Sequence, residues 1–146
     1  ASKRLHLLPD TLKSTLVAGR IVTEERGWAP YAEAQNLALA LAKRYDAALA
    51  DVDVLVMPTT PMVAPPLPAA EDIGSSSTII DAIGLDSARN VAPFNVSGHP
   101  GLSVPAGLDE QGLPIGLMAV GRQADDAMVL RVGRAVEKHF QLGPAA

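Results

Sequence analysis

Apolar residues recur along this chain with two spacings, one typical of helices and one typical of strands. Between Pro30 and Ala50 they recur every three or four residues, which predicts a helix with one apolar face. The members of this face are Tyr31, Ala34, Ala38, Leu41, Tyr45 and Leu49. The run from Asp53 to Met57 is almost continuously apolar and ends at Pro58, so we predict a buried strand there.

Shorter apolar patterns predict one helix near each end of the chain. Pro9 opens a helix that continues to about Ala18 and stops at Gly19, and a polar connection follows it. Asp125 is placed to cap a final helix that continues to about Phe140. The buried face of this final helix is expected to comprise Met128, Val132, Ala135 and Val136.

The stretch from Asn90 to Gly121 is rich in glycine and proline, and it contains two short apolar runs. These runs, Leu102–Val104 and Ile115–Val120, are each bounded by Gly or Pro, as strands are. The polar connection 108–112 between them predicts a strand, a turn and a second strand. The corner Gly98-His99-Pro100 turns the chain before the first of these strands. Because helices alternate with apolar strands, the sequence predicts the α/β class.

Proline dominates the segment after the first predicted strand. Pro58 to Pro68 carries five prolines in eleven residues, which excludes regular helix and central strand because proline fixes φ and lacks an N–H donor. We expect an extended loop that continues to Ser77, which can cap the next segment. Three residues of that segment share one helical face before Pro93, namely Leu85, Ala88 and Ala92.

Composition limits the classes of function. The chain has 146 residues, of which 48% are apolar, so it can bury a core as one domain. A net charge of −4 argues against binding a nucleic-acid backbone, which needs clustered Lys and Arg. The absence of cysteine excludes disulfides and thiolate zinc sites and fits a cytoplasmic protein. No apolar run reaches about 18 residues, so no membrane span is expected.

The three histidines form no metal-ligand pattern with other His, Asp or Glu residues, so neither a metal nor another cofactor is expected. His139 lies near a helix end, where a cation suits the helix dipole. His99 stands in the Gly-Pro corner, where we expect a hydrogen bond that holds the turn. A general-base role for His99 is the alternative.

Two clusters suggest catalytic groups, and both have simpler interpretations. A serine nucleophile in Ser75-Ser76-Ser77 would need a base within hydrogen-bond reach, and the nearest downstream lysine is Lys138. We therefore expect these serines to form a loop and a helix cap. Asp51 and Asp53 stand at a helix-to-strand junction, where solvated turn residues are expected and paired carboxylate chemistry is the alternative.

Asn95 and Arg89 each have a local and a functional interpretation. Asn95 follows Pro93-Phe94 at the end of a predicted helix, where its side chain can bind its own backbone two residues on. It could equally form a pocket wall. Arg89 is by default a surface arginine, and the alternative is a guanidinium that binds a carboxylate.

Several of these motifs, in this order, resemble the C-terminal region of the amidase signature family. The most specific is N-x-x-G-H-P-x-L-S-V-P-A-G from Asn95 to Gly107, followed by G-L-P-I-G-L from Gly112 to Leu117. The run Met57–Pro61 matches as well, and the resemblance covers the chain from about Leu8 to Phe140. One departure is Gly101, where the family more often has Ala; it lightens the packing of the corner but changes no chemistry.

The resemblance implies a serine amidohydrolase that converts a carboxamide to a carboxylic acid and ammonia. Such enzymes fold as one α/β domain around a mixed central sheet covered by helices, and their Ser-Ser-Lys triad lies upstream of the region matched here. This chain would be the C-terminal part of an amidase and inactive alone. Its partners would be a small amide substrate and the missing N-terminal part. A homo-oligomer stays open, and neither nucleic acid nor membrane is an expected partner.

By the same resemblance, the segment that precedes Asn95 lines the acyl pocket. The pocket candidates in this chain are Leu85, Ala88, Arg89, Ala92 and Asn95. The chain then divides into a helix and connection (1–29), a helix–strand unit (30–58), a Pro/Ser-rich loop (59–77), the pocket segment with two strands (78–121) and the C-terminal helix (122–146). The alternatives are a non-catalytic scaffold or association module, or part of a glutamine-hydrolysing transamidase subunit or a ureide hydrolase.

Overall fold

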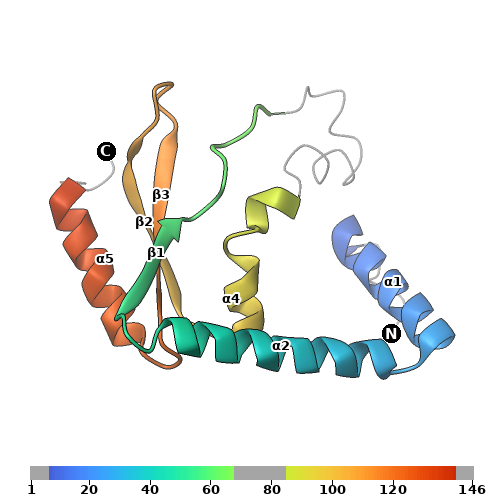
Figure 1. Ribbon diagram of the computed structural model, residues 1–146. Helices are drawn as coiled ribbons and strands as arrows, with labels where there is room; N and C mark the ends of the chain where they lie inside the picture. Colours follow the sequence, from blue (N-terminus) through green and yellow to red (C-terminus); the bar gives the residue numbers. More distant parts are fainter. Residues whose placement is uncertain (1–6, 68–84, 141–146) are drawn as a thin grey trace.

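The computed structural model describes residues 7–67 and 85–140, which form a small sheet with helices around it (Figure 1). In chain order the elements are α1 (Asp10–Arg26), α2 (Ala29–Ala48), β1 (Val54–Pro58), the 3₁₀ helix η2 (Leu85–Ala88), α4 (Ala92–Ser97), β2 (Gly101–Leu108), β3 (Pro114–Gly121) and α5 (Asp126–Phe140). The α/β class is confirmed. The serines 75–77 and the helix start predicted beside them lie outside the described residues.

The three described strands form an antiparallel sheet in the order β1-β3-β2. A tight turn joins β2 to β3, and in it Asp109 Oδ1 accepts hydrogen bonds from the N–H groups of Gln111 and Leu113. The hairpin predicted from the two apolar runs is therefore confirmed. β1 pairs with the other side of β3, where Val56 lies opposite Ala119.

β1 is an edge strand, and the expectation of a buried strand is wrong. Leu55 and Met57 pack against the core from one face of β1. Val56 points to the opposite face and is 55% exposed. On that face α5 packs on β2 and β3, so it leaves the side chains of β1 open to solvent.

The core lies between the sheet and the helices α2 and α4. Its buried members are Phe94, Met118 and Val120. The ring of Tyr45 on α2 packs on the ring of Phe94 at a centroid distance of 4.8 Å. Leu49, just after α2, is fully buried. The C-terminal half of α2 is thus fixed against α4 and the core by Tyr45 and Leu49 of the apolar face that its sequence predicts.

α5 covers the opposite face of the sheet. Its predicted cap is confirmed, because the N–H of Met128 donates to Asp125 Oδ1 at 3.2 Å. The predicted buried face is only partly right. Val129 and Gly133 are the buried residues of α5, whereas Ala135 is exposed. Gly133 lets the helix approach β2 closely, since a Cβ there would overlap Leu102 Cδ2.

α1 is longer than predicted. It continues through Gly19 to Arg26 and ends where Gly27 adopts φ 65°, so the stop at Gly19 and the polar connection after it are wrong. Gly19 lies inside the helix with nothing within 4 Å of the place a Cβ would take. A single glycine in a helix costs only about 1 kcal/mol relative to alanine, too little to end it.

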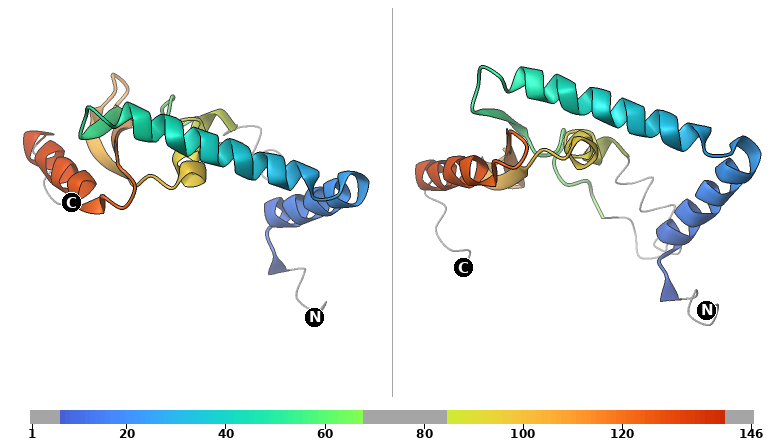
Figure 2. Two further views of the ribbon diagram at one scale, coloured as in Figure 1. Left: turned by 60° about the horizontal axis from the view of Figure 1, so that its bottom comes forward. Right: turned by 90° about the horizontal axis from the view of Figure 1, so that it is seen from below.

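We call residues 10–39, which comprise α1 and the first half of α2, the helical arm. It extends away from the sheet in every view (Figures 1 and 2). Neither α1 nor α2 contains a buried residue. The large apolar side chains exposed on the arm are Leu12, Leu16, Val17, Ile21, Val22, Trp28, Tyr31, Leu37 and Leu39. Within the described ranges, none of the helices combines the length and the apolar character that crossing a membrane requires.

Candidate functional site

The candidate pocket segment, residues 85–95, forms η2, a turn and the first part of α4. Pro93 lies in the first turn of α4, where its missing N–H costs nothing, so the helix does not end there as expected. Asn95 is consequently a helical residue rather than one that follows a helix. Ala88 is half-buried, and Ala92 is exposed.

Asn95 makes no local bond of the kind expected for it. Its side chain is exposed and has no hydrogen-bond partner in the part of the chain that the structure describes. Inside a helix the amide N–H groups nearby are already engaged, so an Asn side chain gains little from its own backbone. The place of Asn95 in a pocket wall stays a prediction.

Arg89 is a surface arginine, as the simpler interpretation predicted. It forms an ion pair with Asp86 at 2.8 Å, and both side chains are largely exposed. Such pairs contribute about 0–1 kcal/mol, so Asp86 holds the guanidinium only weakly. A second carboxylate could displace this partner, and the carboxylate-binding alternative remains a prediction.

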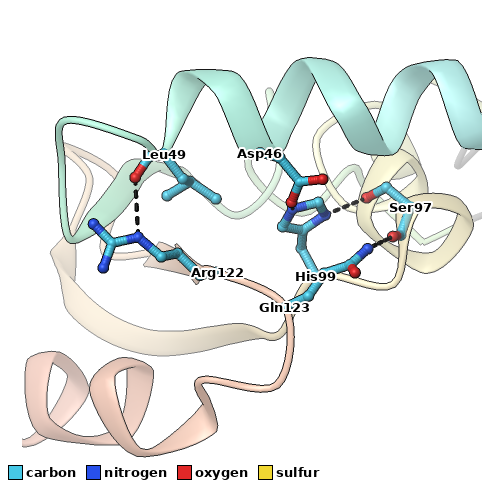
Figure 3. Close-up of polar contacts among 6 residues, drawn as sticks. All are labelled: Asp46, Leu49, Ser97, His99, Arg122 and Gln123. Atoms are coloured by element: carbon cyan, nitrogen blue, oxygen red, sulfur yellow. Dashed lines mark hydrogen bonds and ion pairs between the residues drawn. The ribbon is translucent and has the colours of Figure 1, made fainter.

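The corner at Gly98-His99-Pro100 is fixed by a polar cluster around the buried side chains of Ser97 and His99 (Figure 3). Gly98 adopts φ 76°, which ends α4 and reverses the chain. The ring of His99 is fully buried; its Nδ1 lies 3.0 Å from Ser97 Oγ and its Nε2 lies 3.3 Å from Asp46 Oδ1. Gln123 donates from Nε2 to the carbonyl oxygen of Ser97 at 2.8 Å. The prediction that His99 holds this turn is confirmed.

The hydrogen-bond partners of His99 determine which ring nitrogen carries the proton. A carboxylate only accepts, so His99 Nε2 carries the proton donated to Asp46. In the neutral ring, Nδ1 then accepts the hydroxyl proton of Ser97. His99 therefore links α2 to the corner before β2.

Ser97, His99 and Asp46 are linked in the order of a hydrolytic triad, but a substrate could not reach the serine hydroxyl. A nucleophilic oxygen must reach the carbonyl carbon of a substrate. Ser97 is only 5% exposed, and its hydroxyl is turned to the histidine inside the corner. The arrangement holds helices together, and it offers no open nucleophile.

Arg122 is a second tie that sequence patterns did not reveal. Its Nε donates to the carbonyl oxygen of Leu49 at 3.0 Å, and its Nη2 donates to the carbonyl oxygen of Val52 at 3.0 Å (Figure 3 shows the first). The guanidinium thus joins the end of β3 to the connection between α2 and β1. The only local signal was its position directly after a strand.

Replacing Arg122 with lysine is expected to lower the free energy of unfolding by about 1–2 kcal/mol. A lysine ammonium cannot reproduce the planar fork that satisfies two carbonyl oxygens at once. Urea denaturation measures the change. Arg134→Lys on the exposed face of α5 is the matched control, expected within about 0.5 kcal/mol of the parent. Equal midpoints for both variants would show that the fork does not stabilise the fold.

The remaining candidates take their simpler roles. Asp51 and Asp53 are exposed in the turn before β1, as solvated turn residues are. His139 is exposed at the end of α5, where its ring meets that of Phe140 edge-on. Across residues 7–67 and 85–140, no three His, Asp or Glu side chains gather as ligands for a metal ion.

Comparison with known proteins places this chain in a family. A sequence model described as Amidase matches residues 1–130. The uncharacterized protein in the nthA 5′ region of Rhodococcus erythropolis is 48% identical over 94% of this chain and 69% of that protein. The enantioselective amidase of Rhodococcus rhodochrous is 41% identical over 87% of this chain and 24% of the enzyme. A crystal structure of an amidase superposes with a TM-score of 0.63 at 32% identity, covering 90% of this chain and 29% of the other.

Proposed function

Because the chain belongs to the amidase family, we propose that it forms the substrate-pocket and sheet-completing part of an amidase. The reaction is hydrolysis of a linear carboxamide to a carboxylic acid and ammonia. The nucleophilic serine, the bridging serine and the lysine of the family lie in an upstream part of the enzyme. The chain spans 24% of the length of the Rhodococcus rhodochrous amidase, which leaves room for such a part.

The observation that carries this proposal is the helical arm. A contiguous apolar surface that monomeric proteins seldom expose is normally covered by other protein. The arm presents nine large apolar side chains and has no buried residue. Among the described strands, β1 adds an edge without a further partner strand, and natural sheets pair or cover such edges. The upstream part of an amidase domain would cover both.

The chemistry of the proposed enzyme needs groups of two kinds. The upstream part supplies the acyl-forming serine with its base, and backbone donors stabilise the oxyanion. This chain supplies a wall that positions the amide, formed by residues 85–95. A positioning wall raises the rate by holding the substrate near the nucleophile.

The test is ammonia release by the complete enzyme. The complete amidase that carries this sequence is expected to release ammonia from simple carboxamides. The upstream part and the 146-residue chain can also be expressed separately and then mixed. The mixture should show amidase activity that neither part has alone. Correctly assembled complexes without any amide hydrolysis would favour the non-catalytic scaffold instead. The proposed location is the cytoplasm, where cell fractionation should find the activity.

The isolated chain is expected not to react with a fluorophosphonate probe for activated serines. The described serines have partners other than lysine, since Ser97 contacts His99 and Ser103 contacts Thr59. Mass spectrometry of the treated chain detects any adduct, and the complete enzyme, labelled in its upstream part, is the positive control. An adduct at Ser97 or within residues 75–77 would refute the placement of the nucleophile upstream.

One observation favours a second candidate, a transamidase subunit that hydrolyses glutamine. The guanidinium of Arg89 is exposed in the pocket segment, and its ion-pair partner among the described residues is the exposed Asp86. It is therefore available for the free carboxylate of a glutamine-like substrate. Profiling of the complete enzyme with amides that do or do not carry a second carboxylate decides between the candidates, and ureides in the same panel test for a ureide hydrolase.

A further inference from the structure

Asn90 connects the candidate pocket segment to the sheet. It lies in the turn between η2 and α4, and its Nδ2 donates to the carbonyl oxygen of Pro58 at 2.8 Å. Pro58 is the last residue of β1, 32 positions earlier in the chain. The bond therefore brings the turn of the pocket segment to the carboxyl end of an edge strand.

The acceptor faces the free edge of β1. The next residue, Thr59, donates its N–H to the carbonyl oxygen of Gly116 on β3 at 2.8 Å. Backbone groups of successive strand residues point to opposite sides, so the carbonyl oxygen of Pro58 points away from β3. Asn90 occupies an acceptor that another strand would otherwise use, and pairing along this edge stops there.

The end of β1 is itself held rigidly. The hydroxyl groups of Thr59 and Ser103 lie 2.5 Å apart and tie β1 to β2 across Gly116 of β3. A Cβ at Gly116 would lie 2.7 Å from Thr59 Oγ1, so no larger residue fits without moving the hydroxyl pair. Asn90 thus anchors its turn to a point that all three strands fix.

The other end of the segment is fixed independently. Phe94 packs in the core, and Ser97 is held by His99 and Gln123. Ala92 lies between these two anchors, and Ala88 and Arg89 directly precede Asn90. The bond of Asn90 is the polar link of this stretch to the sheet, because the ion pair of Arg89 with Asp86 stays within the segment. Val91 adds an apolar contact with the core.

We propose that Asn90 is a positioning residue that sets the width of the acyl pocket by anchoring residues 88–92 to the carboxyl end of β1. This inference rests on the proposed function, since it takes the segment as the pocket wall. Asn90 touches no reacting atom. Its loss should change which acyl groups fit more than it changes the chemical step, so the effect falls on KM and on selectivity.

The experiment measures kcat and KM of the complete amidase for carboxamides with acyl groups from acetyl to phenylacetyl. Asn90→Asp keeps the shape but replaces the donor by a carboxylate, and Asn90→Ala removes the side chain. Both variants are expected to change the ratio of kcat/KM between large and small amides at least about fivefold, the factor that one ordinary hydrogen bond represents. The change should lie mainly in KM. Gln111→Glu, the equivalent change from an amide to a carboxylate in the exposed turn between β2 and β3, is the control expected to keep the parent ratio.

The aspartate variant offers a readout that a general loss of structure would not give. Lowering the pH from 7.5 towards 4.5 protonates part of the introduced carboxyl, which can then donate to Pro58 again. Its selectivity should return towards the parent value over this range, whereas that of Asn90→Ala should not. The carbonyl oxygen of Pro58 disfavours a negative charge opposite it and so raises the pKa of the introduced carboxyl group. The recovery of selectivity should therefore begin within the pH range of the assay.

The outcomes separate this inference from the function it rests on. A parent enzyme that hydrolyses none of the amides refutes the proposed function. An active parent whose folded Asn90 variants keep its selectivity and KM overturns the role of Asn90. If Asn90→Ala and Asn90→Asp do not fold, Asn90→Ser, with a short hydroxyl donor, takes their place. Failure of all three to fold would make Asn90 a purely structural residue and equally overturn the proposal.

Discussion

Replacing His99 with alanine is expected to lower the free energy of unfolding by about 3 kcal/mol. The variant removes a fully buried ring and leaves a cavity in the corner. It also leaves the buried hydroxyl of Ser97 without its partner, which costs about 1–3 kcal/mol by itself. The tie from α2 to the corner through Asp46 is lost as well. Urea denaturation followed by circular dichroism measures the change.

His139→Ala is the matched control for this variant. His139 is exposed at the end of α5, so its loss should change the free energy of unfolding by no more than about 0.5 kcal/mol. If both histidine variants unfold at the same urea concentration, the cluster around His99 contributes no stability. The confirmed hydrogen bonds would then serve only to orient the chain.

Replacing Gly133 with valine is expected to destabilise the protein by about 2–3 kcal/mol. A Cβ at this position would overlap Leu102 Cδ2 and lie 3.4 Å from Val104 Cγ1. The leucine end can rotate away from a single methyl group, but valine branches at Cβ and cannot avoid both neighbours. α5 would have to move off β2, which uncovers the adjacent Val129.

Gly19→Val separates this clash from the intrinsic effect of the substitution. Both glycines are helical, but a Cβ at Gly19 meets nothing within 4 Å. Valine and glycine differ in helix propensity by only about 0.3 kcal/mol, so Gly19→Val should be nearly neutral. Similar losses in thermal unfolding for the two variants would mean that helix propensity, and not the contact with β2, sets the cost.

Long apolar patterns predicted their elements correctly, and single punctuating residues did not. α2, the hairpin and α5 follow from repeated apolar spacing, which many residues determine together. The predicted end of α1 rested on Gly19 alone, whereas the glycine that ends the helix in the structure is Gly27. Pro93 misled in the same way, because a proline suits the first turn of a helix as well as its end.

The burial of β1 could not be predicted from its sequence. An apolar run is equally suited to a central strand and to an edge strand whose cover comes from elsewhere. The exposure of Val56 indicates that this face of β1 is suited to be covered by another protein segment. The same holds for the helical arm, whose exposed apolar residues are not covered by any other described part of the chain.

In the candidate site, too, local interactions were predictable from the sequence and long-range interactions were not. Sequence reasoning correctly gave His99 the task of holding its turn, because the task is set by its neighbours Gly98 and Pro100. It could not provide Asp46, which lies 53 positions away. The long-range hydrogen bonds of Arg122 and Asn90 were not predicted for the same reason. Both side chains donate to backbone carbonyl oxygens, which carry no sequence signature. The assignment of residues 85–95 as a pocket wall remains a prediction.

The strand order has a consequence for how the protein folds. β2, β3 and α5 follow one another directly in the chain, whereas β1 reaches β3 only across η2, α4 and β2. Contacts that close short loops form first, so the hairpin with α5 is expected to form the folding nucleus and β1 to add last. Because the entropy of closing a long loop grows only logarithmically with its length, the chain between β1 and η2 can lengthen or shorten at little cost. The length of this connection can therefore vary during evolution while the order and pairing of the three strands stay the same.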